Sequence, residues 1–266
     1  MSKKYEIIPT NTIRVKTSTL YRIRALRSFA EVKAGDLGGY IAKEDNLSHE
    51  GNCWITSGCY VADNAQVIDN ARIKGQARVT DNAIISDDAY LEGDCHVAEN
   101  ARVYGKAHIC DSSVVYGNAE IFDEAIIEDN ARIAGSTLIY NKATVGGSAY
   151  IWEFCHVADE AVVGGQAQCH GKSYIGGKAK VRGQAEVFGD ATIKGDTILS
   201  GGVSVGGYIT LTTGSFMGGT LNQKAPPIYK KTETRPSKPA NNKIEQEIHK
   251  DLEDLWNRRE YKGGQS

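Results

Sequence analysis

Histidine is the side chain best suited to proton transfer near neutral pH, and four lie in the central part of this chain. They are His96, His108, His156 and His170. The first three are separated by multiples of six residues but never by a multiple of 18. No Ser/His/Asp grouping and no phosphate-binding glycine motif accompanies them. His156 is a weak candidate for a catalytic base. The spacing favours the alternative, in which these histidines lie on the solvated surface.

The six cysteines do not have the spacing of a metal site. There is no CxxC pair, so we expect no bound metal. Four cysteines take the small-residue position of the repeat described below, Cys169 takes its aliphatic position, and all five are predicted to be buried. Only Cys110 is predicted to point outward. The four cysteines at the small-residue position are Cys53, Cys59, Cys95 and Cys155.

Aromatic side chains recur at intervals of 18 residues or its multiples, in two series that should lie outside two walls of the fold. Contiguous apolar surface often marks an interaction site, which makes these residues candidates for binding a ligand or a partner. The alternative is that like side chains stack only to stabilise the fold. The first series is Tyr104, Phe122 and Tyr140; the second is Tyr116, Trp152 and Phe188, with Tyr150 beside it.

These candidates are positioned by a repeat of six residues. From Cys53 to Thr197, every sixth residue is Ala, Cys, Ser or Thr. The residue two later is Ile, Val or Leu, with Cys169 as the exception, and a turn former such as Gly or Asp follows. Alternate residues of a strand face one side, so the small and the aliphatic residue both point inward. A short fixed period of this kind is typical of a parallel β-helix.

Three hexads make one coil of 18 residues, and the sequence offers a check on that length. Residues 18 apart should stack, and one such column alternates in charge throughout, as close neighbours require. A second column repeats asparagine, which tolerates the left-handed conformation. The first column is Asp88, Lys106, Glu124, Lys142, Glu160, Lys178 and Asp196; the second is Asn64, Asn82, Asn100 and Asn118. We therefore predict a triangular prism, with a last degenerate coil through Ile209, Leu211 and Met217.

Four segments follow from this pattern. Residues 1–46 are predicted to form a β cap over one end, because exposed edge strands invite aggregation. Residues 47–222 form the β-helix. Residues 223–240 are a proline-rich linker. Residues 241–266 are predicted to form a C-terminal amphipathic α-helix.

Further apolar residues are candidates for self-association or docking. On the third wall they are Ile126, Val162 and Ile198. On the C-terminal helix they form one stripe, which packs on the prism or a sister subunit, or docks another protein. That stripe is Ile244, Ile248, Leu252, Leu255 and Trp256.

Charge limits the partners. Residues 41–222 hold 13 basic and 23 acidic side chains, and such an acidic body is a poor binder of phosphate backbones. No apolar run approaches the roughly 18 residues of a membrane span, and the first residues lack a signal peptide's apolar stretch. We expect a cytoplasmic protein that binds neither nucleic acid nor membrane. The basic residues of the cap form either a simple cap surface or a contact with the acidic walls of a neighbour. They are Arg14, Lys16, Arg22, Arg24 and Arg27.

The hexads resemble the hexapeptide repeat of left-handed β-helix proteins, best known among trimeric acyltransferases. The stretches VKAGDLGG and NLSHEGNCW also resemble the N-terminal cap of bacterial and prophage proteins grouped with hexapeptide transferases. The resemblance implies a left-handed coil and a homo-oligomer, with a trimer favoured. For an acyltransferase it also implies a catalytic histidine at a subunit interface, an extruded loop and a groove for the pantetheine arm. The unbroken hexads leave no extruded loop, although Gly146 and Gly164 stack on a bare edge.

The sequence thus favours a non-catalytic, oligomeric β-helix that binds a host protein or sequesters a small ligand, with no cofactor. A phage or prophage accessory factor directed against host defence is one such role. The first alternative is an acyltransferase using acetyl-CoA. The second is a passive structural spacer.

Overall fold

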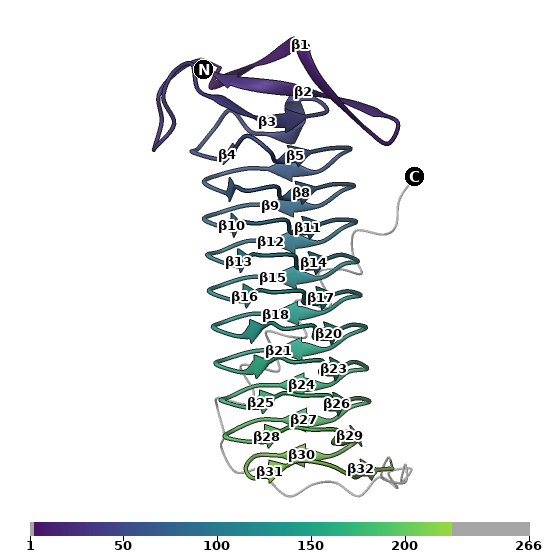
Figure 1. Ribbon diagram of the computed structural model, residues 1–266. Coiled ribbons are helices and arrows are strands. Elements are labelled where there is room, and N and C mark those ends of the chain that lie inside the picture. The colour runs from purple at the N-terminus through teal and green to yellow at the C-terminus, as the bar shows by residue number, and fades with distance from the viewer. Residues whose placement is uncertain (1–2, 225–266) are drawn as a thin grey trace, which may run out of the picture. The chain divides into compact units, whose positions relative to one another are not determined.

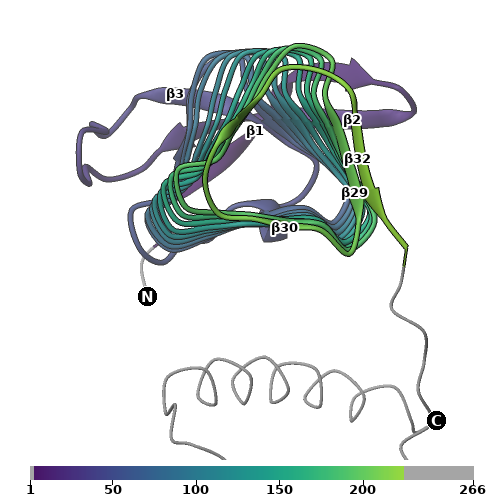
Figure 2. The same ribbon diagram turned by 90° about the horizontal axis from the view of Figure 1, so that it is seen from below.

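The computed structural model describes residues 3–224, which form an all-β solenoid of about ten turns (Figure 1). Viewed along its axis, the coil is triangular, with three parallel sheets as its walls (Figure 2). Within each wall, paired residues lie 18 apart for most of the length, as Tyr90 and His108 do. The predicted 18-residue coil is therefore confirmed. The only helix among the described residues is the short 3-10 turn η1 (Glu44–Asn46).

The strands follow one another around the three walls. Wall 1 consists of β1 (Tyr5–Val15), β2 (Ser18–Ala25), β3 (Leu37–Ile41), β5 (Tyr60–Val61), β8 (Arg78–Val79), β11 (His96–Val97), β14 (Val114–Val115), β17 (Arg132–Ile133), β20 (Tyr150–Ile151), β23 (Gln168–Cys169), β26 (Glu186–Val187), β29 (Ser204–Gly207) and β32 (Thr220–Gln223). Wall 2 consists of β4 (Trp54–Ile55), β7 (Arg72–Ile73), β10 (Tyr90–Leu91), β13 (His108–Ile109), β16 (Ile126–Ile127), β19 (Thr144–Val145), β22 (Val162–Val163), β25 (Lys180–Val181), β28 (Ile198–Leu199) and β31 (Ser215–Phe216). Wall 3 consists of β6 (Gln66–Val67), β9 (Ile84–Ile85), β12 (Arg102–Val103), β15 (Glu120–Ile121), β18 (Leu138–Ile139), β21 (His156–Val157), β24 (Tyr174–Ile175), β27 (Thr192–Ile193) and β30 (Thr210–Leu211).

The core is filled by the two inward residues of each hexad. Ala125 and Ile127 are fully buried, and the same holds for the small and aliphatic residues along the coil. The five cysteines predicted to be inside are buried, and Cys110 is partly exposed, as predicted. Small residues near each corner let the three walls meet, and the aliphatic side chains fill the space between them.

Each corner turns through a residue with positive φ. Glycine, an acidic residue or asparagine occupies this position, as in Gly165 (φ 69°) and Asp123 (φ 58°). Where the residue is acidic, its carboxylate accepts a hydrogen bond from the backbone N–H one coil later. Asp123 accepts from Asn141 in this way, at 3.1 Å. The side chain therefore joins adjacent coils at the position that already needs a left-handed backbone.

Side-chain ladders run along the corners. The asparagine ladder is present: Asn64, Asn82 and Asn100 each donate from Nδ2 to the Oδ1 of the asparagine one coil later, at 3.2–3.3 Å. In the column of alternating charge, Lys142 lies 3.8 Å from Glu124. Both columns lie where the 18-residue period predicts them.

An antiparallel hairpin covers the N-terminal end. β1 pairs with β2, β2 pairs with β3, and β3 joins the parallel ladder through β5. Trp54 is buried beneath the cap, with the ring of Phe29 5.5 Å away. Asn46 ties η1 to the first coil, because its side-chain amide donates to the carbonyls of Asp63 and Ala65.

The last coil is shorter than the others, which corrects one prediction. Ile198 pairs with Ser215 and Ser204 pairs with Thr220, so the period falls from 18 to 17 and then to 16 residues. As a result Phe216 packs against the core, whereas Met217, predicted to continue the inward phase, is 75% exposed. The predicted proline-rich linker and C-terminal helix, with their stripe Ile244, Ile248, Leu252, Leu255 and Trp256, lie outside the described residues, apart from the first positions of the linker.

Candidate binding surfaces

Aromatic rings form a continuous strip on the outside of wall 1. The ring of Trp152 stacks on Tyr150 at 4.5 Å and on His170 at 4.3 Å, and His170 stacks on Phe188 at 5.9 Å. The hydroxyls of Tyr116 and Tyr150 lie 3.1 Å apart, which extends the strip by one ring. We call these five residues, Tyr116, Tyr150, Trp152, His170 and Phe188, the aromatic strip.

The local sequence explains why this strip is continuous. Tyr116, Ala134 and Trp152 follow one another at 18-residue intervals, so a small residue breaks the column. Tyr150 lies on strand β20 next to this gap, and Ala134 is only 5% exposed although it is not an inward residue. Beyond the last ring the column reaches Gly206, where a Cβ atom would lie 2.0 Å from the ring of Phe188. The ring of Phe188 therefore packs against the backbone of Gly206, which has no side chain.

Acidic and hydroxyl groups contact the rings of the strip. Glu186 lies 3.3 Å from His170 Nε2 and accepts a hydrogen bond from Ser204 Oγ at 2.8 Å. The Ser204 hydroxyl and then His170 lower the pKa of Glu186. Glu153 lies 4.0 Å from His170 Nδ1. The hydrogen bond with Tyr150, together with burial, raises the pKa of Tyr116 to about 12, so that hydroxyl stays protonated.

A second, shorter set of rings lies on wall 3. Tyr104, Phe122 and Tyr140 stack at 5.0 and 5.1 Å with their planes within 4° of parallel. We call these three residues the aromatic stack. Burial raises the pKa of Tyr104 and of Tyr140. Two coils further, on β24, the Tyr174 hydroxyl donates to Asp159 at 3.3 Å, a contact that sequence reasoning missed because Tyr174 belongs to a different column.

The ring geometry limits what either surface can bind. The rings stack face to face along the axis of the coil, so the faces of interior rings such as Phe122 and Trp152 are covered by their neighbours. A sugar or a nucleobase needs an open ring face on which to stack. The interior rings therefore present only their edges, and edges suit the side chains of another protein surface better than a planar ligand.

Wall 2 presents a flat apolar band instead of rings. Ile126, Thr144 and Val162 follow one another in the parallel ladder and are half-buried. Beside them, a Cβ atom at Gly164 would meet nothing within 4 Å, so another surface could approach closely. We call Ile126, Thr144, Val162 and Gly164 the apolar band. Lys180 lies between Val162 and Ile198 in the ladder. Ile198 was predicted to belong to the same docking surface as Ile126 and Val162, but it is not contiguous with them.

The histidines do not form a catalytic or metal-binding group. His96, His108 and His156 lie on walls 1, 2 and 3 respectively, as their spacing predicts. Burial lowers the pKa of His156. Among residues 3–224 there is no group of three or more His, Cys, Asp or Glu side chains that could hold a metal ion.

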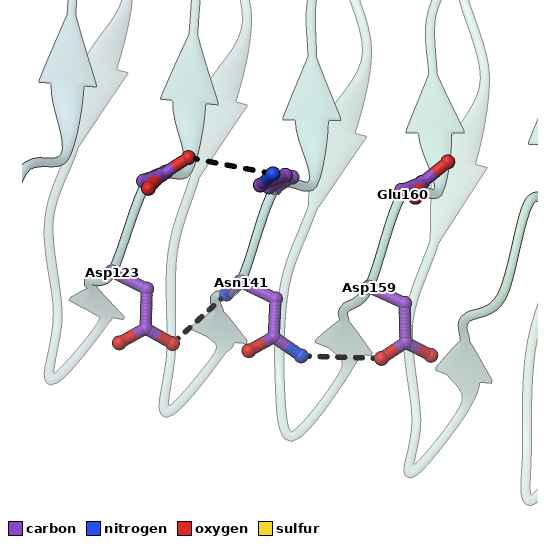
Figure 3. A pocket seen from close by; sticks show the side chains of 6 residues that line it. Asp123, Asn141, Asp159 and Glu160 are labelled. Carbon is purple, nitrogen blue, oxygen red and sulfur yellow. Dashed lines mark hydrogen bonds and ion pairs between the residues drawn. The ribbon is translucent and has the colours of Figure 1, made fainter.

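A shallow depression lies at the corner after wall 3 (Figure 3). Asp123, Asn141 and Asp159 line it in consecutive coils and are linked by hydrogen bonds, including one from Asn141 Nδ2 to Asp159 Oδ1 at 3.1 Å. Asp159 also accepts from the backbone N–H of Gly177 at 2.8 Å. These carboxylates are therefore engaged in holding the coil together. The depression does not include any ring of the strip or the stack.

No family model matches this chain, and no curated protein matches it. The class of protein that the structure defines is a three-walled β-solenoid with an antiparallel cap. No helix of the described residues is long and apolar enough to cross a membrane.

Proposed function

We propose that this protein is a non-catalytic, oligomeric binding protein that contacts other proteins through its walls. The observation that carries the proposal is the arrangement of the aromatic strip, in which neighbouring rings cover the faces of Trp152 and His170 and leave their edges outward. The exposed Phe154, at 57%, lies at the adjoining corner and extends the apolar surface. In this proposal the strip contacts a partner, and the apolar band brings copies of the chain together.

The proposal extends to features that are expected from the resemblance and, for the cytoplasmic location, from the lack of long apolar runs. The coil is left-handed, the oligomer is a trimer, and the protein acts in the cytoplasm of a bacterial cell. The partner is a host protein, as for a phage or prophage accessory factor. A host protein is favoured over a small ligand because the shallow depression of Figure 3 is lined by charged and amide side chains that are bonded to one another.

A lysine on the apolar band tests self-association. Val162→Lys would place a charge at the centre of the band, and we expect it to convert the oligomer to a monomer in light scattering after size-exclusion chromatography. Thr192→Lys is the matched control, because Thr192 is a half-buried outward residue of wall 3. An oligomer that survives Val162→Lys would contradict this assignment.

Truncation of the strip tests partner binding. We expect the double variant Trp152→Ala/Tyr116→Ala to remain folded and oligomeric, because both side chains lie outside the core. It should lose at least tenfold in the capture of a host protein from bacterial lysate, because aromatic residues dominate protein interfaces. Phe122→Ala/Tyr140→Ala on wall 3 is the control. Equal capture by the wild-type protein and the strip variant would rule out the strip as the contact.

A further inference from the structure

A lysine amine is buried beside a thiol where the cap meets the first coil. Lys4 and Cys53 are both fully buried, and Lys4 Nζ lies 3.1 Å from Cys53 Sγ. The same amine donates to the carbonyl of Glu50 at 3.1 Å, and its nearest approach to an aromatic group is 5.3 Å, to the ring centre of Phe29. The proposed function uses neither residue.

The surroundings favour the neutral amine. Transferring an ammonium group from water into a protein interior is unfavourable without a charged partner, and the polar groups in contact with Lys4 Nζ are backbone carbonyls and a thiol. Burial accordingly lowers the pKa of Lys4, and burial also raises the pKa of Cys53. The amine nitrogen and the thiol sulfur therefore lie in direct contact, in surroundings that disfavour the charged form of each.

Hydrogen bonds fix the backbones of both Lys4 and Cys53. The N–H of Lys4 donates to His49 Nδ1 at 3.1 Å, and its carbonyl accepts from Leu26 at 3.0 Å. The N–H of Cys53 donates to the carbonyl of Asp69 at 2.8 Å. The thiol is placed to donate to the carbonyl of Ser48, at 3.4 Å, which leaves the sulfur open towards the amine.

The contact sets Cys53 apart from the other buried cysteines. Cys59 and Cys95 lie near backbone carbonyls, and Cys155 accepts a hydrogen bond from the Ser173 hydroxyl. Within residues 3–224, no other cysteine sulfur has a hydrogen bond from a lysine amine.

We propose that Lys4 and Cys53 form an oxygen-dependent covalent bridge, Nζ–O–Sγ, which fastens the cap to the coil. The oxidant is dioxygen, a small apolar molecule that enters protein interiors. The S–H bond and one N–H bond break, S–O and O–N bonds form, and the O–O bond is cleaved. One oxygen atom remains in the bridge, and the other leaves as water with the two hydrogens. Nitrogen and sulfur together lose the four electrons that reduce dioxygen.

The bridge would close a loop between residues 49 positions apart. A covalent link of this kind stabilises the folded state mainly by restricting the unfolded chain. Because β1 and β2 cover the N-terminal end of the core, the link would keep the cap closed when oxygen is present. Dithiothreitol would cleave the bridge: two molecules of it supply four electrons, the amine and the thiol are restored, and the bridging oxygen leaves as water.

Intact-mass measurement of the full-length protein tests the proposal. After incubation in air, we expect a gain of about 14 Da from one oxygen gained and two hydrogens lost, whereas a sulfenic acid adds about 16 Da. Dithiothreitol should remove the gain. Trypsin should release peptides 4–14 and 44–72 joined to each other, and fragmentation should place the link at Cys53 rather than at Cys59. The bridged form should also unfold at a temperature several degrees higher than the reduced form.

The variants Cys53→Ala and Lys4→Met should both abolish the gain of mass. Methionine keeps most of the lysine stem in the core without an amine, and near-ultraviolet circular dichroism of each variant reports whether the cap has formed. Wild-type protein that shows no gain of about 14 Da after days in air would overturn the proposal, as would a gain that dithiothreitol does not remove.

Discussion

The corners of the solenoid are built in two ways. Up to Asp159, most positive-φ corner residues are acidic or Asn, and glycine is interspersed among them. From Gly165 to Gly207, every corner residue with positive φ is glycine. The backbone φ is nearly the same in the two regions, at 58° for Asp123 and 68° for Gly183. Acidic and glycine corner residues thus adopt the same left-handed backbone conformation.

The difference shows how side chains can contribute to a repeated fold. An acidic corner accepts the N–H of the next coil, as Asp129 does from Gly147 at 2.7 Å, but its Cβ strains a left-handed backbone. Glycine avoids the strain and adds no link, while it leaves the unfolded chain more freedom. The first region is therefore joined by side chains at its corners, and the second relies on its backbone ladder and core.

The largest effect is expected for a bulky residue at a glycine corner. Gly183→Val puts a β-branched side chain at φ 68°, a backbone conformation that β-branched residues rarely adopt. We expect a loss of about 3 kcal/mol in the free energy of unfolding, measured in urea. Gly183→Asn should lose less than about 1 kcal/mol, because Asn141 adopts this conformation in the first region. Equal losses for the two variants would contradict the comparison.

A moderate effect is expected when an acidic corner loses its carboxylate. Asp123→Ala keeps a Cβ at φ 58° but no longer accepts the Asn141 N–H, so we expect a loss of about 1–2 kcal/mol in the same unfolding measurement. Asp123→Asn retains an acceptor and should stay within about 0.5 kcal/mol of wild type. Asp123→Gly relieves the strain and should fall between them. An alanine variant as stable as the asparagine variant would show that the hydrogen bond adds nothing.

Acid should weaken the first region selectively. The backbone N–H of Glu99 and the Thr80 hydroxyl lower the pKa of Asp81 in the folded protein. Because the folded-state pKa is depressed, this stabilisation is present above the ordinary aspartate pKa and is lost as pH falls through the folded value. Protection factors for hydrogen exchange, corrected for the pH dependence of the intrinsic exchange rate, should therefore fall in the coils around Asp81 on acidification, and Asp81→Asn should reduce that change. Asp196→Asn, in the glycine-cornered region, is the control, and an identical acid response in both variants would refute the assignment.

The smallest effect concerns the rings. Phe122 is stacked on both faces, by Tyr104 and Tyr140, whereas Phe188 stacks on one ring, His170. Phe122→Leu should lose about 1 kcal/mol in the free energy of unfolding, and Phe188→Leu about half of that. The opposite order would indicate that burial against Gly206 matters more than stacking.

The sequence predicts the parts of the fold that repeat, and the structure agrees in particular positions. The hexads place Ala125 and Ile127 inside, and the 18-residue period places Asn82 beside Asn100. The prediction fails at Met217, because the shortened last coil shifts the phase and no periodic signal reveals the shift.

The candidate surfaces are only partly predictable for a related reason. Stacking of Tyr104 on Phe122 follows from register alone. The contact of Tyr150 with Tyr116 depends on a side chain leaning past Ala134, which spacing does not specify. The contact between Lys4 and Cys53 joins the cap to the coil across 49 residues, where no repeat relates the two.

Native mass spectrometry of the purified protein, alone and with acetyl-CoA, tests the central claim most directly. A non-catalytic binding protein that associates through the apolar band should appear as a homo-oligomer, with a trimer expected, and should take up no acetyl-CoA. A monomer would contradict the role of the band. An oligomer that binds about one acetyl-CoA per chain, with submicromolar affinity, would contradict the non-catalytic assignment and would favour acyl transfer.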